Sequence, residues 1–220
     1  MTSHLDVVFL DVGGPIYGDR PYYEALWKAI AEARPEASES EFWEEFDACR
    51  RDQKGPFTRR LVLKFLPPGD LHRVIDRGRE LWEYPPDSLR PDVRPALEAL
   101  QENYRIGVLA NQERWIRQTM SRDDLDRFFD IWIISAEVGV EKPDPRIFEV
   151  AVEAADVAPS RCAMVGDRLD NDVVPAKALG MRGVWLLRGE APDDPTPDQI
   201  ARVDAAVRSL AELPRALGQL

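Results

Sequence analysis

The sequence has few cysteines and no long apolar run. Only two of its 220 residues are Cys, too few for a disulfide framework. Neither Cys49 nor Cys162 has a His or Cys at the spacing of a zinc ligand. Both lie among apolar neighbours, so we expect them to be small core residues. No segment approaches the ~20 apolar residues that a membrane-spanning helix needs.

Positive charge is also scarce. The 29 Lys and Arg residues face 40 Asp and Glu residues, a net charge of −11. We therefore expect no nucleic-acid partner, because phosphate backbones need clustered basic side chains. A small anion can still be bound locally by a metal ion, one lysine and backbone N–H groups. The stretch Met1–Phe9 lacks the basic start of a signal peptide, so we expect a cytoplasmic protein without a membrane partner.

Short apolar segments, each bounded by polar or turn residues, predict strands. Helical patterns separate them over most of the chain. This alternation predicts an α/β fold, a Rossmann-like parallel sheet with helices on both faces, in which ligands gather at the carboxyl ends of the strands. The expected strands are Leu5–Leu10, Arg105–Leu109, Ile131–Ser135, Arg161–Val165 and Gly183–Leu187, with Asp204–Val207 as a sixth candidate, and the expected helices between them are Pro91–Glu102, Pro145–Ala155 and Asp172–Leu179.

Residues 22–89 break this alternation, because their pattern is almost entirely helical. An apolar stripe beginning at Tyr22 predicts the first helix. Ser38, followed three residues later by a glutamate, has the spacing of a capping box before the second. Phe57–Phe65 predicts a third helix, and Asp70 is expected to cap a fourth. The segment therefore reads as a helical insertion between the first two core strands, its aromatic side chains forming mostly its own core.

Four loops that follow predicted strands concentrate polar residues. They contain Asp11-Val12-Gly13-Gly14, Ala110-Asn111, Lys142-Pro143-Asp144-Pro145, and Gly166-Asp167 with further acids at 170 and 172. Each has an ordinary structural explanation when taken alone: a strand-end turn, a surface lysine, or a helix cap at Asp172. Three acids within six residues can also bind a hard cation through oxygen.

In order and separation, the four loops resemble the signature motifs of the haloacid-dehalogenase-like hydrolase superfamily. The most specific matches are Lys-Pro-Asp-Pro at 142–145 and Gly-Asp-x-x-x-x-Asp at 166–172. The resemblance covers essentially the whole chain. It implies a Rossmann-like core domain of residues 1–18 and 90–220, with a helical cap domain of residues 19–89.

The resemblance also implies a role for each matching residue. Asp11 would be the nucleophile that forms an aspartyl-phosphate. Asp11 and Asp167 would hold Mg²⁺, which screens the carboxylate from the phosphate. Lys142 would neutralise the phosphoryl oxygens and orient Asp11, and Asp172 would hold Lys142 or a metal-bound water.

Further contacts are implied around these residues. Gly13 would lend its backbone carbonyl to the metal. Gly14 and Asn111 would join Lys142 in binding the phosphate. Arg168 is a candidate for substrate contact.

Two positions depart from the family pattern. Phosphatases of the family usually carry a proton-transferring Asp where this chain has Gly13, and a Ser or Thr where it has Ala110. General acid–base help is worth ~10²–10⁴-fold, so its loss should slow poor leaving groups most. The amide of Asn111 or a backbone N–H could replace the missing hydroxyl. The candidate replacement proton carriers are Tyr17, Asp19, Glu113 or a cap residue.

We favour a Mg²⁺-dependent phosphatase acting on a small phosphorylated metabolite. The double departure leaves open a catalytically weak or inactive binding or regulatory protein. A 2-haloacid dehalogenase is a further alternative, because such relatives also lack the second Asp, although they need no metal. A phosphonate-cleaving relative would need a cap lysine, Lys28, Lys54 or Lys64. The chain is expected to be a monomer or homodimer, with Trp115 and Trp132 in the core rather than at an interface.

Overall fold

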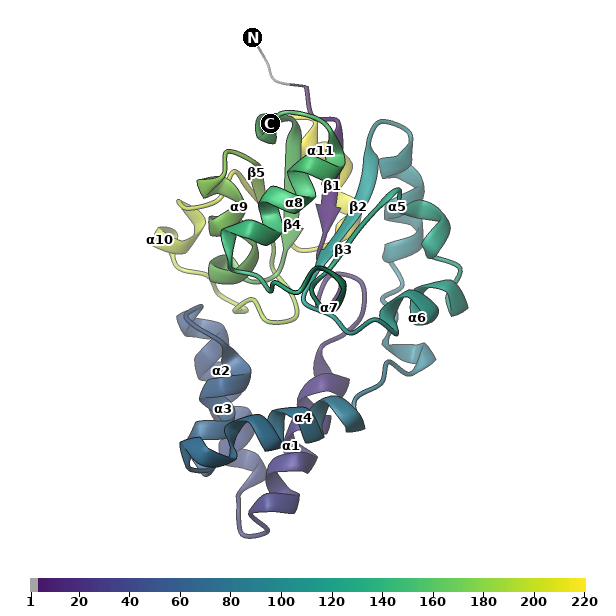
Figure 1. Cartoon of the computed structure of the whole chain (residues 1–220). Helices are drawn as coiled ribbons and strands as arrows, with labels where there is room; N and C mark the ends of the chain where they lie inside the picture. The colour runs from purple at the N-terminus through teal and green to yellow at the C-terminus, as the bar shows by residue number, and fades with distance from the viewer. Residues whose placement is uncertain (1–3) are drawn as a thin grey trace.

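Residues 4–220, which the computed structural model describes, form one six-stranded parallel sheet (Figure 1). The strand order is β3-β2-β1-β4-β5-β6. The predicted α/β fold is therefore confirmed, sixth strand included; Met1–Ser3, in the stretch considered as a leader, lie outside the described residues. The strands are β1 (Val7–Leu10), β2 (Arg105–Ala110), β3 (Ile131–Ile134), β4 (Cys162–Gly166), β5 (Arg182–Leu186) and β6 (Ala205–Val207).

Helices cover both faces of this sheet. Successive side chains of a strand point to opposite faces. Val8 and Leu10 of β1 therefore pack in one cluster with α5 and α6, whereas Val7 and Phe9 pack in another with α8 and α9. Coverage on both sides explains why the strands are almost continuously apolar. The helices of this part are α5 (Val93–Gln101), α6 (Ile116–Arg122), α7 (Ser135–Val138), α8 (Pro145–Ala155), α9 (Val174–Ala178), α10 (Pro197–Ile200) and α11 (Leu213–Leu217).

Four further helices gather below the sheet in Figure 1 and share a separate hydrophobic cluster. They are α1 (Arg20–Ala33), α2 (Glu39–Asp52), α3 (Phe57–Phe65) and α4 (Leu71–Leu81). Ser38 caps α2 as predicted, accepting a hydrogen bond from the backbone N–H of Glu41. The predicted cap at Asp70 is wrong. This residue precedes α4, but its carboxylate accepts from the Arg73 side chain at 2.8 Å instead of from the helix backbone.

The helix expected at Asp172–Leu179 is shorter than predicted. A π-helical turn, Leu169–Val173, comes first, and α9 then begins at Val174. The prediction that Asp172 caps this helix is wrong, because its carboxylate accepts from the backbone N–H of Arg168, at 2.9 Å, on the preceding side. Gly180, with φ of +94°, follows the helix as expected.

The two cysteines are buried, as predicted. Trp115 and Trp132 are half-buried and pack against the sheet's core rather than lying wholly inside it. Most insertion aromatics pack in the cluster of α1–α4, but Trp82 packs against the sheet's cluster instead. Among residues 4–220, no helix has the length and apolar character that crossing a membrane requires.

Candidate active site

The four polar loops converge at one edge of the sheet. β1 and β4 are neighbours with Leu10 opposite Val165, so Asp11 and Asp167 leave the sheet side by side. Asp11, Asp167 and Asp172 each bring one carboxylate oxygen into a cluster whose members all lie within 4.8 Å of one another. Three residues that are up to 161 positions apart are thus joined by the register of two central strands.

Lys142 lies inside this cluster and is buried. Its Nζ is 3.0 Å from Oδ1 of Asp11 and 2.7 Å from Oδ1 of Asp172. Asn111 holds the backbone of Lys142 in place through two hydrogen bonds. Its Oδ1 accepts from the N–H of Lys142 at 2.7 Å, and its Nδ2 donates to the carbonyl of Lys142 at 2.9 Å. The amide expected to contact phosphate is therefore largely committed to positioning the lysine.

Glycines allow the acidic loops to approach closely. Gly14 has φ of +79°, and a Cβ there would lie 2.0 Å from Oδ2 of Asp167. A Cβ on Gly166 would lie 2.4 Å from Oδ2 of Asp172. The backbone N–H of Gly14 donates to the carbonyl of Tyr17 at 2.8 Å. This N–H is therefore used within the turn, and the observed contribution of Gly14 is space for Asp167. The phosphate contact expected of Gly14 stays a prediction.

Glu190 is a neighbour of the site that the sequence analysis missed. Its backbone N–H donates to Oδ2 of Asp167 at 2.7 Å, and its side chain accepts from the Tyr23 hydroxyl at 2.8 Å. The available signal was its place in the loop after β5, the strand next to β4. Trp185, on β5, donates its indole N–H to the carbonyl of Asp167 at 2.8 Å. Asp167 is thus fixed from the neighbouring strand.

Arg168 joins the acidic loop to the helices below. Its guanidinium pairs with Asp170 at 2.7 Å and Glu190 at 3.2 Å, donates to the carbonyl of Gly55 at 2.7 Å, and lies 3.9 Å from the centre of the Phe57 ring. Most of its hydrogen-bonding capacity is used in this way. Its position supports a bridging role more directly than the expected substrate contact.

Burial sets the charge state of the cluster. It raises the pKa of Asp11 to about 7, although Lys142 opposes the shift. Burial and the nearby carboxylates of Asp19 and Glu190 likewise raise the pKa of Asp167. Burial would lower the pKa of Lys142, but the carboxylates of Asp11 and Asp172 outweigh it and raise the pKa. The raised pKa values of Asp11 and Asp167 show that these carboxylates crowd together with a single ammonium group among them.

The donors present fit a hard cation. All three clustered side chains offer carboxylate oxygen, which Mg²⁺ and Ca²⁺ prefer. A cavity of about 910 Å³ opens beside them, lined by the four loops and by residues of α1, α3 and α4 such as Tyr22, Phe57 and Arg79. This volume lies within the usual range for sites that take small molecules.

The proposed replacements for Gly13 differ in position. The Tyr17 hydroxyl donates to Asp123 at 2.8 Å, and this residue is not among those lining the cavity. Glu113 lines the cavity, 3.7 Å from Arg79. Asp19 lines it too and is buried beside Gly13. The insertion lysines considered for phosphonate cleavage, Lys28, Lys54 and Lys64, are not among the described residues that line the cavity.

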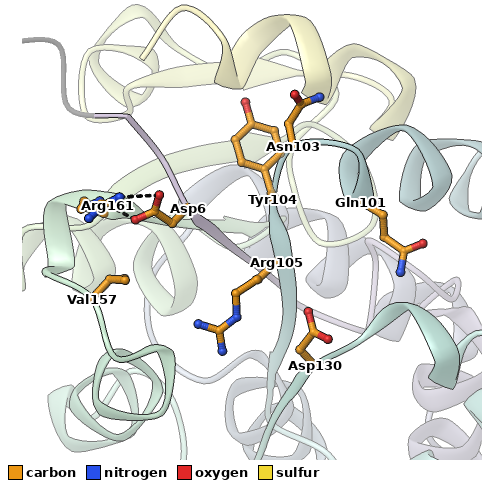
Figure 2. A pocket seen from close by; sticks show the side chains of 8 residues that line it. All are labelled: Asp6, Gln101, Asn103, Tyr104, Arg105, Asp130, Val157 and Arg161. Atoms are coloured by element: carbon orange, nitrogen blue, oxygen red, sulfur yellow. Dashed lines mark hydrogen bonds and ion pairs between the residues drawn. The ribbon is translucent and has the colours of Figure 1, made fainter.

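A second hollow lies near the opposite ends of the strands (Figure 2). Its lining includes Asp6, which precedes β1, and Arg105, which begins β2. Figure 2 shows Asp6 paired with Arg161 across one side of it. The four polar loops follow the strands, whereas these residues precede or begin them. The second hollow is therefore not part of the candidate active site.

Comparison with known proteins agrees with this geometry. The profile of the haloacid dehalogenase-like hydrolase family matches residues 5–180. Phosphoserine phosphatase of Thermus thermophilus is 36% identical over 159 residues, 68% of this chain and 62% of that protein. Glyceraldehyde 3-phosphate phosphatase of Pyrococcus furiosus is 38% identical over 138 residues, which are 60% of this chain and 55% of that protein. The chain thus matches only about three fifths of these curated relatives.

A solved structure shares the architecture over nearly its whole length. The crystal structure of a phosphatase from Thermococcus onnurineus, of the same superfamily, has a TM-score of 0.64 and 26% identity to this chain. The match covers 97% of this chain and 98% of that one. The similarity therefore extends through the helices α1–α4 as well as the sheet.

Proposed function

This chain belongs to the haloacid dehalogenase-like hydrolase family, and we propose that it is a Mg²⁺-dependent phosphatase acting on a small phosphate ester. The observation that carries the proposal is the placement of Lys142 between Asp11 and Asp172, beside Asp167, at the edge of a cavity. The relatives named for phosphoserine and glyceraldehyde 3-phosphate support a phosphorylated metabolite as the class of substrate.

Asp11 is the proposed nucleophile. One of its carboxylate oxygens attacks phosphorus, the bond from phosphorus to the ester oxygen breaks, and an aspartyl-phosphate forms. Lys142, 3.0 Å from Asp11, orients this carboxylate and offers positive charge to the phosphoryl oxygens. Water then attacks phosphorus, releasing inorganic phosphate and restoring Asp11.

Asp11, Asp167 and the backbone carbonyl of Gly13 are the proposed Mg²⁺ ligands. Asp172 is proposed to hold Lys142 and water near the ion. When bound, the cation supplies the charge that lets an anionic ester approach a carboxylate. The clustering of three carboxylates around one ammonium group supports this assignment.

Residues 19–89 are proposed to be a cap domain over a core of residues 1–18 and 90–220. The cap side chains that line the cavity would exclude water around the reacting groups. The contacts of Arg168 with Gly55 and Phe57 would hold the cap in this position. A cytoplasmic location, a monomer or homodimer, and the absence of nucleic-acid and membrane partners remain expectations from the sequence.

The proposal is tested by phosphate release from 4-nitrophenyl phosphate with Mg²⁺ and with EDTA. We expect activity that requires Mg²⁺ and is lost in Asp11→Asn, because the amide cannot form the aspartyl-phosphate. Asp130→Asn, an exposed change near the second hollow, should retain activity. Phosphate release by Asp11→Asn at the wild-type rate would contradict the proposed nucleophile.

The same assay separates the alternatives. Chloride release from 2-chloropropionate without added metal would identify a dehalogenase. Failure to hydrolyse any of a broad set of phosphate esters, with Mg²⁺ still bound, would favour a binding or regulatory protein.

A further inference from the structure

Gly13 leaves the proposed phosphatase without a proton-transferring side chain where relatives usually carry one. We propose that Asp19 supplies this carboxyl group from a different place in the chain. The inference rests on the proposed function, since it assigns a step of the same reaction.

The carboxyl group of Asp19 fills the space beside Gly13. A Cβ added to Gly13 would lie 2.9 Å from Oδ1 of Asp19, closer than such atoms normally approach. Its next neighbours would be the Tyr84 hydroxyl at 3.5 Å and Nε2 of Gln112 at 3.8 Å. A side chain at position 13 would therefore require the carboxyl group of Asp19 to shift. The missing group and its proposed replacement share one location.

The chain reaches this location by a short turn. Gly13 pairs with Tyr17 in a β-bridge, and the N–H of Gly14 donates to the Tyr17 carbonyl. Asp19 follows two residues later at the N-cap of α1. Asp is among the preferred N-cap residues because its carboxylate can accept from the helix backbone. Here it makes no such bond, and it lines the cavity instead.

Asp19 is buried, yet part of its carboxylate is free of donors. Its exposed fraction is 9%. No N–H group or hydroxyl among residues 4–220 hydrogen-bonds to its buried Oδ2. A buried acceptor without a donor is costly unless something else satisfies it. The water that attacks the aspartyl-phosphate can donate a hydrogen bond, and then its proton, to this oxygen.

Tyr84 and Gln112 are further neighbours of the same space beside Gly13. Nε2 of Gln112 donates to the Tyr84 hydroxyl at 3.4 Å, and the Tyr84 ring stacks on Tyr17 with centroids 4.6 Å apart. Both residues are buried. They line the cavity together with Asp19.

The proposed step balances as follows. As the bond from phosphorus to the ester oxygen breaks, the electron pair stays on that oxygen, and the proton of the Asp19 carboxyl group neutralises it to a hydroxyl. The Asp19 carboxylate then takes a proton from water as the water oxygen attacks phosphorus. The bond from phosphorus to Asp11 breaks, and Asp19 ends in its starting form.

The first test compares leaving groups in Asp19→Asn. General acid–base help is worth ~10²–10⁴-fold, so turnover of an alkyl phosphate such as glycerol 3-phosphate should fall at least about 100-fold. With 4-nitrophenyl phosphate, whose leaving group needs little protonation, we expect a burst of about one nitrophenolate per enzyme followed by slow turnover, because hydrolysis of the aspartyl-phosphate is impaired. Glu113→Gln, which removes another carboxylate from the cavity wall, should keep the wild-type dependence on the leaving group.

The second test moves the carboxyl group. Gly13→Asp in the wild-type background should impair activity, because the new side chain meets Asp19. The double variant Gly13→Asp/Asp19→Ala should recover at least about tenfold over Asp19→Ala on the alkyl phosphate. A purely structural role for Asp19 does not predict this recovery. All activities are measured at saturating Mg²⁺, because the Asp19 carboxylate lies close to Asp167 and its charge affects the affinity for the cation.

Three results would overturn the inference. They are an equal loss on both substrates without a burst, no recovery in the double variant, and a loss of activity that excess Mg²⁺ reverses. Failure of wild-type protein on every phosphate ester would instead reject the proposed function. Activity lost in Asp11→Asn but unaffected by Asp19→Asn would reject only the role of Asp19.

Discussion

Lys142 is the residue on which the charge balance of the site depends. It is buried between Asp11 and Asp172, and among residues 4–220 no other Lys or Arg forms an ion pair with either carboxylate. Removing one partner of a buried ion pair is costly because the remaining charge stays away from water without compensation. The lysine therefore affects the stability of the protein as well as its proposed chemistry.

Lys142→Met tests this dependence without a large change in side-chain length. In EDTA we expect the free energy of unfolding, measured by urea denaturation, to fall by about 3 kcal/mol. The control is Lys64→Met, which removes a partly exposed partner of Glu45 and should cost at most about 1 kcal/mol. Equal effects of the two substitutions would contradict a special role for the buried lysine.

At the scale of secondary structure, Asp92 joins elements far apart in the chain. It directly precedes α5 and accepts hydrogen bonds from the Ser209 hydroxyl at 2.8 Å, from the backbone N–H of Leu210 at 3.0 Å and from Arg188 at 2.7 Å. Burial opposes its ionisation, but the hydrogen bonds of Ser209 and Arg188 prevail and hold the pKa of Asp92 below its usual value. Its ionised form thus connects α5 to the loops after β5 and β6.

Asp92→Asn should therefore have a pH-dependent effect on stability. A carboxyl group whose pKa is lowered by folding contributes stability above its unfolded pKa of about 3.9, and that contribution is lost as the pH falls through the lower folded value. We expect a loss of about 1.5 kcal/mol at neutral pH, shrinking below about pH 4. Urea denaturation of wild type and variant across this range measures it, and a difference that grows on acidification would contradict the explanation.

At the scale of the whole molecule, the sequence predicted the sheet well because both of its faces are buried. A strand such as β4 is apolar along its entire length, so its position is visible in the sequence. Long-range hydrogen bonds were not visible. Asp172 has the local spacing of a helix cap, but its carboxylate pairs with Lys142 and accepts a hydrogen bond from the backbone N–H of Arg168. Glu190 has no motif around it, and only the order of the strands brings it to Asp167.

The four loops bring three carboxylates together at one place, and this leads to a prediction for the whole chain. A ligand that binds only the folded state stabilises it by about 2.7 kcal/mol at 100 times its dissociation constant. We expect Mg²⁺ to raise the melting temperature in a concentration-dependent way and EDTA to reverse the effect. Asp167→Asn should abolish most of the shift, as measured by calorimetry. An identical shift in the variant would place the ion elsewhere.

The two ends of the helical segment, residues 19–89, are joined by backbone hydrogen bonds where they meet the sheet. Tyr17 pairs with Leu89 in an antiparallel bridge, the N–H of Gly18 donates to the carbonyl of Ser88, and that of Arg90 donates to the carbonyl of Ile16. We expect that the segment between these hydrogen bonds can be replaced without moving the strands. Asp19 lies just inside that boundary. We expect that a graft of a foreign segment would remove the proposed proton donor together with the side chains of α1, α3 and α4 that line the cavity, and would leave the proposed nucleophile, Asp11, in place.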